Sequence, residues 1–351
     1  MLKRDCAVLS AGPSSNSQCE RDAVTGSVIS SDAGWRLRIV LLLVLSVSMV
    51  SSASILIRFS QSDALVKVFW RTLLGGIIML SAGLARGDHK RTPRRQDVRG
   101  LWKWLLLVGI VLSLHFSTWF ISLELTTVAA SVVLVNNSPI FTALLSTAVL
   151  RESLTHKSWV GVLVAVGGTV VLAWNDLLES GLGALTGDLL AIVSGVFLSL
   201  YFVGGRKYAA MLPLTVYTTT VYFSAAAATL VLCLVLGADV FVPVFIPYEM
   251  MIFLALAIFP TALGHSVNNY LLTLVPAYIV SSAVLGEPIG ASLLAAVILG
   301  EIPSLMTFVG FAVILFGISL VLVGTRARNT RKQSSLDNPD GTKPNDLRGN
   351  A

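Results

Sequence analysis

Two stretches of this chain align without a gap at an offset of 149 residues: "PIFTALLSTAVLRESLTHKSWVGVLVAVGGTVVLAW" (139–174) and "PIGASLLAAVILGEIPSLMTFVGFAVILFGISLVLV" (288–323). Sequence of this biased composition would give roughly three or four identities by chance, whereas ten positions are identical. The identical pairs are Pro139/Pro288, Ile140/Ile289, Leu144/Leu293, Leu145/Leu294, Leu150/Leu299, Glu152/Glu301, Val160/Val309, Gly161/Gly310, Val164/Val313 and Gly168/Gly317. They include proline, glutamate and glycine as well as leucine, so we infer an internal duplication.

Both stretches belong to an unusually apolar chain. Of its 351 residues, 55% are hydrophobic and only 13% are charged, against about a quarter charged in ordinary soluble proteins. About twenty apolar residues in a helix cross a bilayer, and a helix satisfies its own backbone hydrogen bonds there. We therefore predict an all-α membrane protein with ten transmembrane helices, at 37–57, 64–84, 101–122, 126–150, 158–174, 187–206, 213–236, 250–272, 277–299 and 307–324.

The duplication divides these helices into two halves of five, at 35–175 and 187–324. Because five is odd, the second half crosses the membrane in the opposite sense. Inverted repeats of this kind place a binding site near the midplane, between the halves, and allow alternating access. The polar segments 1–34 and 325–351 are expected to be disordered tails.

The distribution of charge predicts the orientation. The formal net charge is +6, and the internal Lys and Arg concentrate in 86–103 and in the gaps that hold Arg151, Lys157, Arg206 and Lys207. Such basic gaps face the cytoplasm, which makes the N- and C-termini cytoplasmic too. The basic surplus is thus a topology signal and no nucleic-acid partner is expected; a patch for anionic lipid at 86–103 is the alternative reading.

Each half carries the same pattern of a proline, a glutamate thirteen residues later and a downstream glycine. These residues are Pro139, Glu152 and Gly161 in the first half and Pro288, Glu301 and Gly310 in the second. Together with Arg71 in "FWRTLLGG" and with "GDLLAIVSGVFLSLYFVGGRK" (187–207), the pattern resembles the EamA-type drug/metabolite transporters over about residues 37–324. The resemblance implies helices three, four, eight and nine around a central cavity, with helices five and ten at the periphery. It leaves the substrate open.

Two charged side chains lie near the middle of predicted spans. A charge at the bilayer centre is costly, so such a residue is a functional candidate by default. Glu287 would carry a proton or pair with a cationic group of the substrate; a neutral Glu287 bonded to a neighbouring helix is the alternative. Arg71 would bind a substrate carboxylate, or pair with Glu287 or with helix-end carbonyls as a structural lock.

Asn136, Asn137 and Ser138 occupy the corresponding depth of the fourth span. Pro139 and Pro288 each remove a backbone donor and disturb the preceding turn. Carbonyls freed there would line a cavity, or the prolines would only set helix curvature. Adjacent amides at this depth are costly unless they bond across helices or to ligand, and both readings stay open.

"HFSTWF" (115–120) and "HSVNNY" (265–270) align at an offset of 150. His115 and His265 would relay protons or simply bond across helix interfaces. Trp119 and Asn269 follow four residues later, on the same helical faces. An aromatic ring and an amide there would grip a planar or zwitterionic solute, with core packing as the alternative for Trp119.

Glu152 and Glu301 fall at helix ends, shortly before Thr155 and Ser304, which are plausible N-caps for the next helices. We expect both glutamates to be structural, fixing the tight turn and complementing the helix N-terminus.

These patterns predict a secondary active transporter of a small polar or amphipathic metabolite, such as an amino acid, driven by proton or ion flux. The sequence has no GxxxxGK(S/T), HExxH or GxSxG motif, so we predict no enzyme activity, catalytic residue, cofactor or metal. Cys6, Cys19 and Cys233 suggest neither a disulfide framework nor a metal site. The alternatives are a lipophilic-cation or drug exporter, an organophosphate or nucleotide-sugar exchanger and, from another class, a membrane-embedded enzyme or receptor. The expected partners are a small-molecule substrate and the lipid bilayer of the plasma (cell) membrane; the oligomeric state is open.

Overall fold

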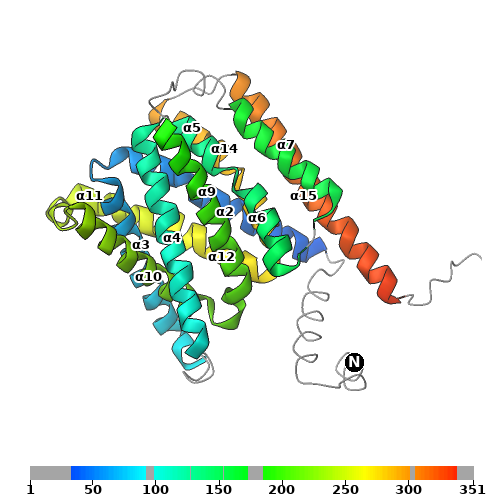
Figure 1. The fold of residues 1–351 in the computed structure, drawn as a ribbon, viewed down its shortest axis with the longest axis horizontal. Helices are drawn as coiled ribbons and strands as arrows, with labels where there is room; N and C mark the ends of the chain where they lie inside the picture. The colour runs from blue at the N-terminus through cyan, green and yellow to red at the C-terminus, as the bar shows by residue number, and fades with distance from the viewer. Residues whose placement is uncertain are drawn as a thin grey trace, which may run out of the picture.

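The computed structural model describes residues 33–91, 99–126, 128–152, 154–172, 185–300 and 305–337, and the regular secondary structure in these ranges is helical (Figure 1). The helices of the first half are α2 (Ala33–Phe59), α3 (Ala64–Arg86), α4 (Arg99–Leu125), α5 (Val128–Val135), α6 (Ser138–Leu145) and α7 (His156–Leu172). Those of the second half are α9 (Leu185–Tyr208), α10 (Leu214–Leu236), α11 (Pro247–Leu256), α12 (Ser266–Leu274), α13 (Ala277–Val284), α14 (Glu287–Leu299) and α15 (Leu305–Asp337). Two π-helical segments, η3 (Ser146–Leu150) and η7 (Ala257–His265), continue α6 and join α11 to α12. The short 3-10 segments are η2 (Asp88–Arg91), η5 (Ala209–Met211) and η6 (Val242–Phe245).

Eight of the described helices are long and apolar enough to cross a membrane. They are Gly34–Phe59, Ala64–Arg86, Gly100–Leu125, Leu185–Met211, Leu214–Leu236, Pro247–Leu274, Ala277–Ile298 and Phe308–Thr325. Two shorter apolar helices, Ser138–Leu150 and His156–Val171, occupy the predicted fourth and fifth spans. The all-helical class is thus confirmed, while the total of ten spans and the cytoplasmic position of both termini stay predictions.

The segment expected to be a C-terminal tail is partly helical. α15 continues to Asp337, and so includes residues 325–337. Once an apolar helix is nucleated, propagation adds one hydrogen bond per residue, and the Arg, Lys and Gln of this segment are good helix formers. Residues 1–32 and 338–351 lie outside the described part of the chain.

The fourth and ninth predicted spans are both broken, at equivalent positions. α5 ends before Asn136–Asn137 and α13 ends before Leu285–Gly286, and these two-residue breaks are 149 residues apart. A proline follows each break, at the second position of α6 and of α14. Proline has no N–H to donate and disfavours helical backbone in the residue before it. The breaks therefore follow directly from the duplicated prolines.

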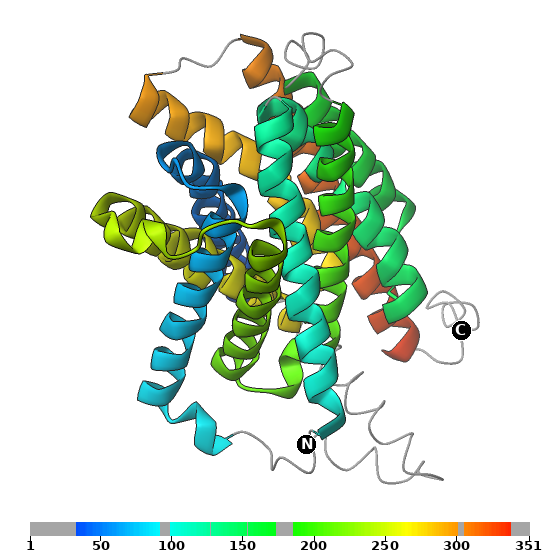
Figure 2. The same cartoon turned by 60° about the vertical axis from the view of Figure 1, so that its left-hand side comes forward.

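The α7 and α15 helices pack side by side along one edge of the molecule (Figures 1 and 2). Glycines allow this close approach: a Cβ on Gly161 would lie 2.7 Å from the carbonyl oxygen of Gly317, and a Cβ on Gly317 would overlap the backbone of Ala165. Gly310 of the duplicated pattern is also buried. The peripheral place of this pair agrees with what the family resemblance implies for helices five and ten.

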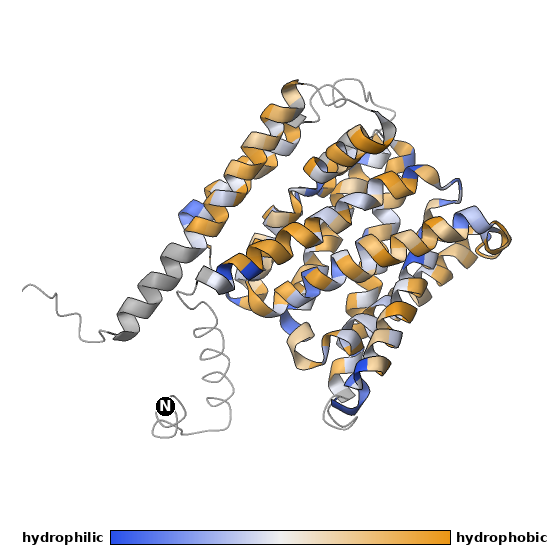
Figure 3. Ribbon diagram, turned by 180° about the vertical axis from the view of Figure 1, so that it is seen from behind, coloured by the Kyte–Doolittle hydropathy of each residue, from blue (hydrophilic) through white to orange (hydrophobic). Residues whose placement is uncertain are grey.

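Hydrophobic residues make up most of each helix (Figure 3), and many large hydrophobic side chains are exposed while many polar ones are buried. Val235, Phe245 and Val297 are 74%, 83% and 84% exposed, whereas Arg71 is fully buried. Such a distribution suits a lipid environment, because the hydrocarbon core offers no partner for polar groups. Buried polar side chains instead bond to groups inside the protein, as the Ser113 and Thr229 hydroxyl groups bond to each other over 2.7 Å.

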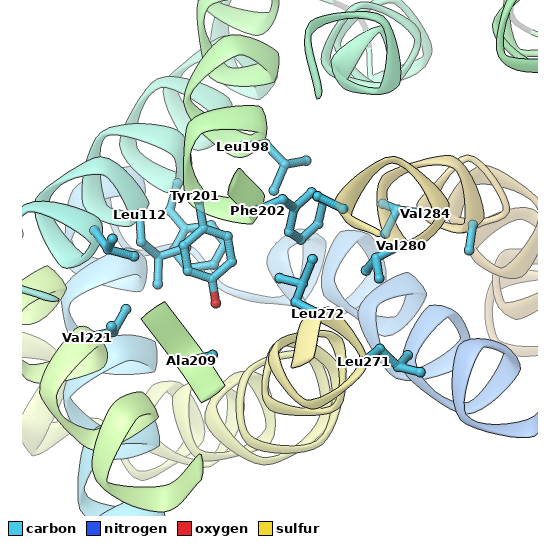
Figure 4. Packing of buried hydrophobic residues seen from close by; sticks show 14 of the residues in the cluster. Leu112, Leu198, Tyr201, Phe202, Ala209, Val221, Leu271, Leu272, Val280 and Val284 are labelled. Atoms are coloured by element: carbon cyan, nitrogen blue, oxygen red, sulfur yellow. The ribbon is translucent and has the colours of Figure 1, made fainter. Parts of the chain in front are cut away.

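An apolar core joins the helices of the second half to each other. Phe202 of α9 packs with Leu272 of α12 and with Val280 and Val284 of α13 (Figure 4). Tyr201, beside Phe202, brings its hydroxyl group into this otherwise apolar layer. Phe202 and Val284 of this layer also line the cavity described below.

Candidate functional site

A cavity of about 20 Å³ lies where residues of both halves meet. Room of this size holds about one water molecule. Its polar lining comes from α4, from the end of α5, from η7 and α12, and from the start of α14, and consists of His115, Trp119, Asn136, His265, Asn268 and Glu287. Five apolar residues complete the wall: Val50, Val135, Leu198, Phe202 and Val284.

The structure thus brings five of the nine predicted pathway residues to one cavity: Glu287, His115, Trp119, Asn136 and His265. The other four, Arg71, Asn137, Ser138 and Asn269, do not line it.

Glu287 is the first residue of α14 and is half-buried. A carboxylate is stabilised at a helix N-terminus by the helix dipole. The Ser51 hydroxyl of α2 donates to the backbone carbonyl of Glu287 over 3.0 Å, which ties this turn to the first half. No ion pair joins Glu287 to Arg71 in the described structure, so the predicted lock between them is not the arrangement seen here.

Arg71, on α3, is fully buried and does not line the cavity. Its guanidinium carbon lies 4.0 Å from the ring centroid of Phe116 and 5.5 Å from that of Phe120. Its Nε donates to the Thr261 hydroxyl over 3.2 Å, while both terminal nitrogens have no hydrogen-bond partner. The charge is held mainly by aromatic faces, and the four N–H donors of the two terminal nitrogens are unpartnered.

The two histidines differ in their bonding. His115 Nδ1 lies 2.8 Å from the hydroxyl and 3.1 Å from the carbonyl oxygen of Ser194, and its ring stacks on Trp119 at 6.3 Å. His265 Nδ1 has no partner, and its ring meets Phe116 edge-on at 5.1 Å. In the described ranges, no group of three or more His, Cys, Asp or Glu side chains gathers as a metal site would require.

The polar residues around the first break have mostly local partners. Asn136 Nδ2 donates to the Val132 carbonyl over 2.7 Å. Asn137 makes no side-chain capping bond to α6. The Ser138 hydroxyl lies 3.5 Å from that of Ser281, between the halves rather than in the cavity. Of the three residues, Ser138 bonds across helices and Asn136 lines the cavity, so the choice between cross-helix bonding and ligand contact stays a prediction.

Of the two glutamates in the duplicated pattern, Glu152 lies within the described residues and makes contacts that differ from those expected. Thr155 caps α7, since its hydroxyl accepts from the Ser158 N–H over 3.1 Å. Glu152 instead pairs with Arg206 at 2.7 Å and accepts from the Ala277 N–H over 3.4 Å, at the start of α13. It therefore complements a helix N-terminus of the other half, not that of α7. Glu301 and Ser304 lie outside the described residues.

A family model for the EamA-like transporter family matches residues 37–174 and 185–323, one match to each half. The chain belongs to the EamA-like transporter family. The match covers most of the chain and confirms the resemblance drawn from the duplicated prolines and glutamates.

Several EamA-like relatives carry the word transporter in their names. An "Uncharacterized transporter" of Clostridium kluyveri is 24% identical over 265 residues, which is 74% of this chain and 84% of that protein. Solute carrier family 35 member F6 of Rattus norvegicus is 30% identical over 98 residues, 26% of each chain. A protein of known crystal structure shares the fold with a TM-score of 0.68 at 22% identity, covering 83% of this chain and 99% of that one. The chain is accordingly a multi-pass membrane transporter.

In this EamA-like chain, sequence reasoning missed Asn268. It is 1% exposed, lines the cavity and has no partner for either amide atom. The predicted residue, Asn269, donates instead to the Tyr201 hydroxyl over 2.6 Å, away from the cavity. Spacing alone admits both residues, because Asn268 and Asn269 follow His265 by three and four residues and residues three or four apart share a helix face.

Proposed function

We propose that this protein is a secondary active transporter that moves a small polar metabolite by alternating access around the cavity, with Glu287 exchanging a proton. One observation carries the proposal: polar side chains of both halves converge on a single cavity, which is small, at about 20 Å³. Ligand pockets usually measure about 300 Å³ or more, so a metabolite requires the halves to move apart.

Ties at one end of the helices support a closed state. Arg206, at the end of α9, pairs with Glu152 at 2.7 Å and donates to the Leu272 carbonyl at the end of α12 over 2.9 Å. Glu152 also accepts from the start of α13. The positive-inside pattern puts these ends on the cytoplasmic side. This pair thus joins the first half to the second beside one mouth of the proposed pathway.

A second set of ties lies at the other end of the same spans. Glu249, near the start of α11, accepts from the hydroxyl groups of Ser60 and Ser62 and from the Gln61 N–H, the last two over 2.9 Å each. Glu249 and Leu272 belong to one membrane-spanning helix of 28 residues, and at 1.5 Å per residue they lie about 35 Å apart. Both ends are therefore tied, as an occluded transporter requires.

In the proposed cycle, Glu287 takes up either a proton or the amine of the substrate, because burial disfavours an uncompensated carboxylate. The unpartnered nitrogens of Arg71 would receive a carboxylate once the Phe116 ring beside the guanidinium group moves away. An amino acid or a related compound satisfies both groups. A lipophilic-cation exporter is the second candidate, favoured because Arg71 does not line the cavity.

Metabolite profiling of cells with and without the protein identifies the transported compound, and proteoliposome flux of that compound at two external pH values tests the mechanism. We expect the pH dependence of flux to disappear in Glu287→Gln and to persist in Glu124→Gln, which alters an exposed glutamate near the end of α4. A Glu287→Gln variant with the wild-type pH profile removes Glu287 from the coupling mechanism.

A further inference from the structure

Asn268 differs from the other asparagines around the cavity in having no partner at all. Asn136 Nδ2 is bonded to a carbonyl of its own helix, and Asn269 Nδ2 is bonded to Tyr201. Asn268 lines the cavity and is only 1% exposed. Neither its amide nitrogen nor its amide oxygen has a hydrogen-bond partner.

An unpartnered buried amide is unfavourable, because the hydrogen bonds that it made to water in the unfolded chain are not replaced. Buried polar groups without partners are rare in folded proteins and call for a water or ligand. The cavity of about 20 Å³ beside Asn268 accommodates about one water molecule. The same space is where a polar group of a ligand would arrive.

The rest of the lining defines what kind of ligand fits. Trp119 Nε1 is a second buried donor without a partner, and His265 Nδ1 is a further unpartnered ring nitrogen. Glu287 supplies the carboxylate. Among the described residues that line the cavity, none is Lys or Arg. The wall therefore offers one site for a cation and several neutral hydrogen-bonding atoms, and it offers no cation for an anion.

We propose that Asn268 forms a neutral subsite, which binds an uncharged group of the substrate that both donates and accepts a hydrogen bond. The substrate is then a small organic amine that also carries a carboxamide or a similar group. The ammonium group lies at Glu287, and the carboxamide accepts from Asn268 Nδ2 and donates to Asn268 Oδ1. This assignment rests on the proposed transport function and changes one part of it: because Arg71 does not line the cavity, the group opposite the amine is a carboxamide at Asn268, and among amino acids and related compounds the substrate is one of the carboxamide-bearing compounds.

Four compounds of similar length separate the two subsites. β-Alaninamide has the amine and the carboxamide, n-butylamine has only the amine, butanamide has only the carboxamide, and β-alanine has a carboxylate in place of the carboxamide. Their affinities are measured by isothermal titration calorimetry on the purified full chain in detergent. We expect β-alaninamide to bind about tenfold more tightly than n-butylamine, as two neutral hydrogen bonds would give, and more tightly than butanamide and β-alanine.

Two substitutions at Asn268 test the assignment independently of folding. Asn268→Leu should bring β-alaninamide to the affinity of n-butylamine, while the empty variant unfolds at the wild-type temperature or higher because it lacks the unpartnered amide. Asn268→Asp should instead gain affinity for 1,3-diaminopropane, whose second ammonium matches the new carboxylate. The control is Thr118→Val at the repeat-related position, where the hydroxyl already donates within α4; it should keep the wild-type order of affinities.

The inference is overturned if wild type fails to bind β-alaninamide, if n-butylamine binds as tightly or more tightly, or if Asn268→Leu keeps the preference. Tighter binding of n-butylamine identifies the lipophilic-cation class instead. The proposed function fails on a different observation, namely that the reconstituted protein moves no metabolite. A protein that moves a metabolite but ignores the carboxamide refutes only the subsite.

Discussion

Replacing Arg206 by methionine should open one end of the transporter. Arg206 bonds to Glu152 at 2.7 Å and to the Leu272 carbonyl at 2.9 Å, and the side chains of the ion pair are only 14% and 16% exposed. A charge-assisted hydrogen bond and a bond to a carbonyl, discounted for this residual exposure, together stabilise the tied state by about 2 kcal/mol. In the proposed cycle this tie exists only when this end is closed, so its loss should shift the equilibrium toward the open state about thirtyfold.

The shift can be measured as the accessibility of the cavity. In a variant whose three native cysteines are replaced, Val284→Cys places one thiol on the cavity wall. Its rate of modification by a membrane-impermeant maleimide in inside-out vesicles should rise about thirtyfold on adding Arg206→Met. The neighbouring Lys207, which is exposed and lies near the Tyr208 ring, is the control: Lys207→Met removes the same charge without the tie and should leave the rate unchanged.

A double variant separates a gate from a static contact. If the Arg206–Glu152 pair acts as one tie, both substitutions remove the same interaction. The maleimide should then modify the introduced cysteine no faster in the Glu152→Gln, Arg206→Met double variant than in the faster of the two single variants. A lower unfolding temperature without any change in the modification rate would refute the reasoning, since the pair would then stabilise both states equally.

Three further predictions concern stability. Gly317→Leu should lower the free energy of unfolding by about 3 kcal/mol, because the leucine side chain would overlap the Ala165 backbone between α7 and α15. The control Gly167→Leu has open space around it and should cost little; equal losses in the two variants would contradict this interface. Glu249→Gln should lower the free energy of unfolding by about 2 kcal/mol, because an anionic acceptor for three donors is lost. An unchanged unfolding temperature would show that these bonds do not stabilise the fold. Arg71→Met should change the free energy of unfolding by less than about 1 kcal/mol, because two of the guanidinium nitrogens have no partner. A loss above about 3 kcal/mol would show that the charge is structurally compensated. All are measured by thermal unfolding in detergent.

The broken helices were predictable from sequence because their cause is local. Pro139 and Pro288 disturb the preceding turn wherever the chain runs, and the structure has breaks at 136–137 and 285–286. The same offset placed Ser138 and Glu287 at equivalent helix starts. Covalent restriction of the backbone is thus readable without knowing what lies beside it.

The choice between Asn268 and Asn269 was not readable from sequence, because it depends on how α12 is rotated. Both residues flank the helix face of His265. The π-helical segment η7, which contains Pro260, precedes α12, and a π-helical turn sets a different rotation from an α-helical one. That rotation turns Asn268 to the cavity and Asn269 to Tyr201.

The sequence could not predict which residues contact Arg71, for a related reason. Phe116 and Phe120 are four residues apart and present one aromatic face of α4, yet only the packing of α3 on α4 shows that this face covers the guanidinium. Spacing along one helix predicts which side chains lie together, but it does not predict which neighbouring helix they meet.

The unpartnered atoms around the cavity bear on how substrate and movement are coupled. Without a ligand, the tied state leaves the Asn268 amide, Trp119 Nε1 and His265 Nδ1 without protein partners beside space for about one water, and each group that stays unsatisfied raises the free energy of that state. A ligand that bonds them lowers the free energy of the closed state more than that of an open state in which water already satisfies the same atoms. Because a ligand shifts a conformational equilibrium only by its differential affinity, a substrate that fits Asn268 favours passage through the closed state. An apolar amine of equal size gains nothing there, so in the proposed cycle selectivity arises at the closing step rather than at first binding.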